Sequence, residues 1–217
     1  MSLFLLTGTT LSYAQLSQEQ IKERKTNLKL SKAELNEKAS KAARKEAKSL
    51  QKQGWSSAPG ALPIEKQLDK SYTMQMEYDE SLFPKYIMAE GMSIGENYDA
   101  AKMQATELAK QGIASLIQTE VTALINNTVS NKQLEAEEAA SVVQSISAAK
   151  NLISQSLGRT ISVVELYRSL PNKNKEVLVR LAYSQEQAKA AAKKAIREDL
   201  EKQGEALHNK LDKALGW

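Results

Sequence analysis

The sequence predicts an α+β fold, in which a four-stranded antiparallel sheet carries long helices packed on one face and an extended N-terminal helix comes first. Short β-rich segments occur in two pairs, and two long helical stretches separate the pairs. This order favours an antiparallel sheet with its helices segregated to one side. Aromatic residues make up only 5% of the chain and alanine is abundant, so the core is predicted to consist of small aliphatic side chains on closely packed helices.

Residues 1–14 have the pattern of a secretory signal peptide. The apolar run Leu3–Leu11 is followed by Ser12-Tyr13-Ala14, a small-x-small site that predicts cleavage after Ala14. The basic residues that usually precede such a run are missing, and the alternative is a buried N-terminal strand. At roughly nine residues the run is too short to span a bilayer as a helix. The chain has no cysteine, which excludes disulfides, thiolate metal sites and a lipid attached to cysteine.

Residues 15–53 are predicted to form a basic helical arm. The stretch Ser17–Gln53 is rich in Lys, Glu, Ala and Gln and contains neither Gly nor Pro. The arm holds a net charge of +7 over Lys22–Lys52, whereas the whole chain is only +4, so the basicity is local. The arm is a solvated helix, a contact for an anionic envelope surface, or a helix that docks into a partner or a second copy. The candidate contact residues are Lys41, Arg44, Lys45, Lys48 and Trp55.

Residues 54–70 are predicted to be an irregular linker, and residues 71–217 an α+β domain. Gly54 is a plausible end for the arm helix, and Ile64–Lys70 has the composition of a short helix. Apolar and polar side chains then alternate over Tyr72–Tyr78, which predicts a strand. A turn leads to a second predicted strand, Lys85–Ile94, so the two are expected to form a hairpin.

Two long helices are predicted next, over Tyr98 to about Ile125 and over Glu135–Leu157. Both repeat small and apolar residues every three to four positions, and Asn97 or Asp99 is available to cap the first. The wide face of small residues predicts that the first helix packs closely on its neighbours.

A second hairpin and a last helix complete the chain. The segments Thr160–Ser169 and Glu176–Tyr183 are rich in β-branched and aromatic residues, and the turn Pro171–Asn174 joins them. Gln185–Leu215 has the composition of another Ala-, Lys- and Glu-rich helix.

The segment GMSIG, residues 91–95, matches the Gly-x-Ser-x-Gly turn that presents a nucleophilic serine in many hydrolases. Glu165 and His208 follow in the order of a catalytic triad. However, several residues separate Ser93 from the next helix, and no parallel βαβ pattern surrounds it. We therefore predict that Gly91 and Gly95 serve the end and bend of a strand, and retain a serine hydrolase using Ser93 as the alternative.

No metal or cofactor site is predicted. His208 is the only histidine, and a transition-metal site needs several His or Cys ligands. Glu135, Glu137 and Glu138 stand near the start of a predicted helix, where acidic residues complement the helix dipole without an ion.

Three stretches resemble the Lpp-twenty family of bacterial outer-membrane lipoproteins. They are AEGMSIGENYDAAKMQATELAKQGIASLIQTEV, a strand ending in glycine that leads into an alanine-rich helix, and the strand-like LGRTISVVELYR and KEVLVRLAYS. The N-terminal domain of a periplasmic flagellar assembly protein is similar in layout. The resemblance covers roughly Lys85–Leu200 and implies an α+β envelope domain with no catalytic residues to carry over. The cysteine that carries the lipid in such lipoproteins is absent here.

These observations together predict a non-enzymatic secreted protein, periplasmic or outer-membrane-associated, with a structural or interaction role. Its expected partner is an envelope protein or an anionic envelope surface that meets the basic helix, and a homo-oligomer is possible. Nucleic acid is not expected, because no stacking aromatics interleave the lysines. No transmembrane span is predicted.

Overall fold

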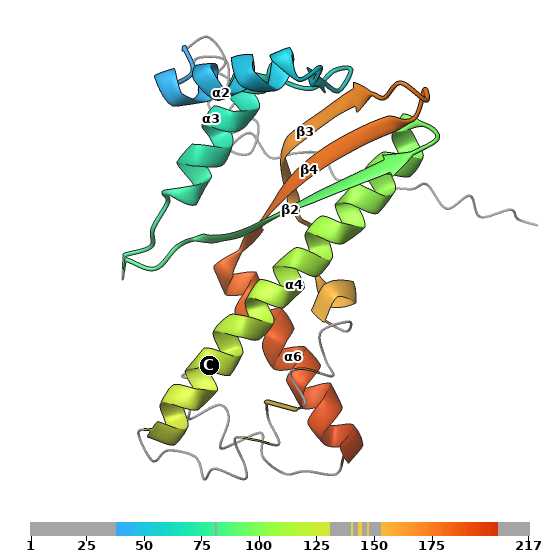
Figure 1. Cartoon of the computed structure of the whole chain (residues 1–217). Helices are drawn as coiled ribbons and strands as arrows, with labels where there is room; N and C mark the ends of the chain where they lie inside the picture. Colours follow the sequence, from blue (N-terminus) through green and yellow to red (C-terminus); the bar gives the residue numbers. More distant parts are fainter. Residues whose placement is uncertain are drawn as a thin grey trace, which may run out of the picture. The chain divides into compact units, whose positions relative to one another are not determined.

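The computed structural model describes residues 38–80, 82–130, 140, 143–144, 147 and 153–203. Its elements in chain order (Figure 1) are α2 (Lys41–Lys52), β1 (Ser56–Ser57), α3 (Ile64–Gln75), β2 (Tyr86–Gly95), α4 (Tyr98–Ser130), β3 (Ile161–Ser169), β4 (Lys175–Ser184) and α6 (Gln185–Gln203). The predicted signal peptide, most of the predicted arm, most of the predicted helix Glu135–Leu157 and the chain after Gln203 lie outside the described residues.

The sheet has four antiparallel strands in the order β1-β3-β4-β2. The hairpin of β3 and β4 is confirmed, and Lys173 in its turn adopts a left-handed φ of 68°. β2 pairs with β4 along its whole length, from Tyr86 opposite Ser184 to Gly95 opposite Lys175. The predicted hairpin between Tyr72–Tyr78 and Lys85–Ile94 is therefore wrong, although its second strand exists as β2.

The predicted strand Tyr72–Tyr78 is largely helix, because α3 continues to Gln75. The buried side chains of α3 recur every three or four residues, which is the spacing of one helix face. They are Ile64, Gln67, Leu68, Ser71 and Met74. The fourth strand is instead β1, in the stretch predicted as an irregular linker, where Ser56 lies opposite Tyr167 of β3.

Helices cover both faces of the sheet, not one face as predicted (Figure 1). Successive side chains of a strand point to opposite faces. In β4, Val177 and Val179 join a core with α4 and α6, whereas Leu178 packs with α2 and α3 on the other side. The second layer forms because α2 and α3 have apolar stripes of their own, which need cover.

α4 confirms the predicted long helix and lies unusually close to β2. A Cβ atom added to Gly91 would lie 2.0 Å from the carbonyl oxygen of Ala105, and one added to Gly95 would lie 2.7 Å from the backbone nitrogen of Ala101. The two glycines thus bring the strand against the backbone of the helix. Asn97 caps α4 as predicted, since its Oδ1 accepts the Ala100 N–H at 2.9 Å.

The described end of the basic arm is a helix of its own, α2, which begins at Lys41. Ser40 is its N-cap: the hydroxyl accepts the Ala43 N–H at 3.2 Å, and the Ser40 N–H donates to Asp69 of α3 at 2.9 Å. The predicted end is confirmed, because Gln53 is the C-cap and Gly54 follows with a φ of +86°. None of the helices in the described part of the chain is long and apolar enough to cross a membrane.

Candidate functional site

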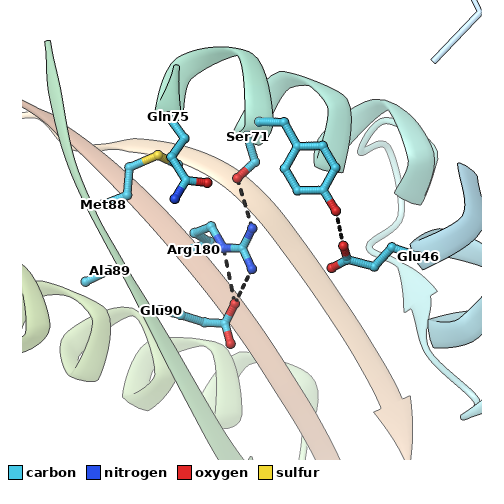
Figure 2. Close-up of a pocket in the computed structure, with 8 residues that line it drawn as sticks. Glu46, Ser71, Gln75, Met88, Ala89, Glu90 and Arg180 are labelled. Atoms are coloured by element: carbon cyan, nitrogen blue, oxygen red, sulfur yellow. Dashed lines mark hydrogen bonds and ion pairs between the residues drawn. The ribbon is translucent and has the colours of Figure 1, made fainter. Parts of the chain in front are cut away.

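A groove of about 430 Å³ lies where α2 and α3 meet β2 and β4 (Figure 2). Its lining residues are mostly polar and come from all four elements. They are Glu46, Ser71, Tyr72, Gln75, Met88, Ala89, Glu90 and Arg180.

Arg180 is the centre of this groove. From β4, its guanidinium donates to Oε2 of Glu90 on β2, with Nη2 at 2.8 Å and Nε at 3.2 Å. Its Nη1 also donates to the buried hydroxyl of Ser71 on α3 at 3.0 Å. Arg180 therefore joins two strands to a helix, and its charge is already balanced by Glu90.

The other acid of the groove is engaged as well. Glu46 of α2 accepts a hydrogen bond from the hydroxyl of Tyr72 on α3, and Figure 2 shows this pair beside the Arg180 cluster. Both clusters bridge neighbouring elements. Arg180 thus joins α3 to the sheet, and the hydrogen bond between Glu46 and Tyr72 joins α2 to α3.

A second polar cluster lies on the opposite face, around Glu165 of β3. Its carboxylate accepts from the hydroxyl of Tyr98 and pairs with Lys102 Nζ at 2.7 Å, both on α4. Burial raises the pKa of Tyr98 well above its usual range, and the hydrogen bond to Glu165 raises this pKa further. The Tyr98 ring also meets Tyr167 edge to face at 5.6 Å. Tyr98 therefore keeps its proton to a higher pH than an exposed tyrosine does, and its hydroxyl donates a hydrogen bond from α4 to β3.

Ser93 lies within β2, opposite Val177, and not at the tip of a turn. The strand continues to Gly95, and the Ser93 hydroxyl donates to Oε1 of Gln104 at 2.6 Å. A nucleophile elbow requires a sharp turn that leads at once into a helix, so Ser93 lacks that geometry. His208 lies outside the described residues.

No group of three or more His, Cys, Asp or Glu side chains placed to hold a metal ion occurs in the part of the chain that the structure describes.

The predicted contact residues separate into two groups. Lys41, Arg44, Lys45 and Lys48, hereafter the basic row, have exposed side chains on α2. Trp55 is only 5% exposed and packs in the core beneath Arg168, whose guanidinium carbon lies 4.7 Å from the ring centroid. Trp55 therefore has little surface to offer a partner.

A group of exposed apolar side chains between α3 and β2 was not predicted from the sequence. Met76 is 70% exposed, Tyr78 49%, Leu82 80% and Phe83 62%. We call these four residues the apolar tip. Leu82 has a φ of 65°, a left-handed conformation that costs a non-glycine residue about 1–2 kcal/mol. The signal in the sequence was the pair Leu82-Phe83 inside an otherwise polar turn.

No family model, no curated protein and no solved structure matches the chain. We therefore infer its function from its own residues.

Proposed function

We propose that this chain is a non-enzymatic interaction protein of the cell envelope, which meets an anionic surface or an acidic partner through the basic row. Export is inferred from the signal-peptide pattern of residues 1–14. The observation that carries the proposal is the basic row, because its four cationic side chains are exposed together on one short helix.

Among the residues that the structure describes, the basic row differs from the other polar clusters in lacking an ion-pair partner. Glu90, Glu165 and Glu176 each pair with a cation of a neighbouring element. By contrast, none of the four cations of the row forms an ion pair with another of the described residues. We propose that an external anion pairs with these charges.

The position of the row is unfavourable for α2 itself. Lys41 occupies the first turn, which contains no acidic residue. Cations near a helix N-terminus oppose the helix dipole, an effect of about 0.3–1 kcal/mol for each charge. Lys41 therefore opposes the stability of α2, which favours a role for this residue outside the helix, whereas Lys45 and Lys48 lie beyond the first turn.

Charge reversal tests this function. We expect Arg44→Glu with Lys48→Glu to move the protein from the envelope fraction to the soluble fraction, since two attractive charges become repulsive. The matched control is Lys70→Glu with Lys189→Glu, which makes the same charge change at exposed positions of α3 and α6. Fractionation that is unchanged in the α2 variant, or equally changed in the control, would exclude the basic row as the contact.

A second measurement addresses the alternative function. A serine-directed covalent probe is expected to leave the chain unlabelled, because Ser93 is held by Gln104 within a paired strand. Labelling that disappears in Ser93→Ala would instead establish a reactive serine and contradict the non-enzymatic proposal.

A further inference from the structure

The apolar tip brings four of the eleven exposed large apolar side chains of the described residues into one short segment, 76–83. The sequence contains only two phenylalanines, Phe4 in the predicted signal peptide and Phe83. The core is built mainly from Ala, Ile, Leu and Val. The one phenylalanine expected in the exported protein is thus exposed, beside three more exposed apolar residues, and such patches mark interaction sites.

The backbone of the tip is held in place by its own hydrogen bonds. The N–H of Asp79 donates to the carbonyl of Phe83 at 2.8 Å, and the N–H of Phe83 donates to Oδ1 of Asp79 at 2.9 Å. The N–H of Leu82 donates to the carbonyl of Asp79 at 3.0 Å. At the base, the N–H of Lys85 donates to the carbonyl of Glu77 at 2.9 Å. These hydrogen bonds join described residues on both sides of position 81, and such constraints reduce the entropy lost on binding.

We propose that the apolar tip inserts into the headgroup region of an anionic lipid bilayer. This inference rests on the proposed function, because it requires that the protein meets an envelope surface. A bilayer offers backbone polar groups few partners, so an inserted segment must satisfy them internally. The hydrogen bonds between Asp79 and Phe83 and from Leu82 to Asp79 satisfy the N–H groups of Asp79, Leu82 and Phe83 in this way.

The basic row is attached to the same helix as the tip. Asp69 of α3 accepts the N–H of Ser40 at the start of α2, and Tyr72 of α3 donates to Glu46 in its middle. The tip begins directly after α3, at Met76. Figure 1 shows α2 and α3 on the sheet face opposite α4. Cations on α2 and an apolar anchor at the end of α3 supply the two contributions that stable peripheral binding requires.

The size of the tip favours a bilayer over a protein partner. Four partly exposed side chains offer roughly a few hundred Å², whereas a specific protein interface buries about 800 Å² on each partner. A bilayer needs no shape complementarity, so a small convex group is sufficient.

Acidic residues next to the apolar tip limit how deeply the tip can insert into the bilayer. Glu80 is exposed, and Glu77 stands between Met76 and Tyr78. Their carboxylates remain in water, so only Leu82 and Phe83 are expected to reach the acyl chains. Removing one charge by Glu80→Gln should strengthen binding to anionic vesicles, by about fivefold at low salt.

Quenching by brominated lipids measures the insertion directly. We expect the emission of Phe83→Trp to be quenched by vesicles of phosphatidylglycerol and brominated phosphatidylcholine. The matched control is Met103→Trp, at a residue that is 74% exposed on α4, across the sheet from α3. Both variants are made in the full chain, so that Trp55, Trp217 and the N-terminal residues contribute equally. Equal quenching in the two variants would overturn the proposal.

Partition into the same vesicles supplies the second measurement. Leu82→Ser with Phe83→Ser should reduce binding about tenfold or more, and Met103→Ser should leave it unchanged. Because all three positions are exposed, these variants are expected to fold, and circular dichroism verifies that they do. Unchanged partition of the double variant would exclude insertion. If the double variant binds lipid vesicles as the wild type does but no longer binds a purified envelope protein, the tip docks into a protein and the bilayer proposal is wrong.

Different results would exclude the contact through the basic row and the insertion of the apolar tip. If brominated lipid does not quench the emission of Phe83→Trp but the wild-type protein still fractionates with the envelope, insertion is excluded. The proposed contact through the basic row then still stands. If the emission of Phe83→Trp is quenched as expected but the Arg44→Glu, Lys48→Glu variant fractionates as the wild type does, the contact through the basic row is excluded. The insertion proposal then still stands.

Discussion

Gly91 is the residue that sets the separation of β2 from α4. A Cβ atom there would lie 2.0 Å from the carbonyl oxygen of Ala105 and 2.6 Å from the nitrogen of Ala109, both backbone atoms that cannot rotate away. We expect Gly91→Ala to push the helix off the strand and to lower the free energy of unfolding by about 1–3 kcal/mol or more. Urea unfolding followed by circular dichroism measures the change.

Gly158 provides the control for this substitution. An added Cβ would meet nothing within 4 Å there, and the residue is not in the left-handed region. Gly158→Ala should therefore change the free energy of unfolding by no more than about 0.5 kcal/mol. If Gly91→Ala is tolerated as well as Gly158→Ala, the close approach of β2 and α4 is not fixed by the missing side chain.

Single residues could be predicted from the sequence where the physical cause is local. Asn97 was a predicted cap because a cap depends only on the residues that follow it. Gly91 and Gly95 were expected to serve the end and bend of a strand, and β2 does end at Gly95. The strand pattern did not indicate that both glycines also admit the backbone of α4. Which backbone approaches a glycine is a tertiary property, and a strand pattern does not contain it.

At the scale of elements, the sequence predicted the helices and strands in which one hydrophobic period extends over many residues and no second period competes with it. α4, β3 and β4 belong to this group. In α3 two periods compete: Tyr72, Met74, Met76 and Tyr78 alternate, whereas residues 64–74 repeat every three to four positions. The helical period prevails because it buries Leu68 completely against β3. β1 is only two residues long, too short for any period, and exists because β3 pairs with it.

The contact between α4 and β3 is expected to weaken in alkali through Tyr98. Burial and the Glu165 carboxylate raise the pKa of Tyr98 above its usual value near 10. The unfolded chain releases this proton near pH 10 while the folded chain retains it. The contribution of Tyr98 to stability is thus complete below pH 10 and is lost as the pH rises through the folded pKa. Urea unfolding between about pH 9 and pH 11 should show a shallower decline for Tyr98→Phe than for wild type.

Glu165→Gln separates burial from charge in this prediction. The amide can still accept the hydrogen bond from Tyr98 but carries no negative charge, so the decline should lie between wild type and Tyr98→Phe. Lys102 and Tyr167, which also face Tyr98, are unchanged in both variants. If the free energy of unfolding of Tyr98→Phe falls with pH as steeply as that of the wild type, the alkaline loss of stability arises from other groups.

For the whole molecule, the sequence predicted the basic row but not the apolar tip, and the reason is physical. Charge is a property of each residue, and a helix without Gly or Pro places Lys and Arg in solvent whatever packs beneath it. The exposure of Leu82 and Phe83 depends on which elements leave a turn uncovered. The second helical layer was not predicted for the same reason. Whether helices cover one face of the sheet or both depends on where α2 and α3 pack, which is a tertiary property.

If the basic row and the apolar tip act on one anionic bilayer, salt should distinguish their contributions. Ionic screening shortens the Debye length from about 30 Å at 0.01 M salt to about 10 Å at 0.1 M, but apolar burial is not screened. The loss of vesicle binding caused by Arg44→Glu with Lys48→Glu should therefore be large at low salt and small at high salt. The loss caused by Leu82→Ser with Phe83→Ser should be nearly the same at both. Vesicle partition measured at the two salt concentrations tests this, and equal salt dependence of the two losses would show that the tip is not buried in lipid.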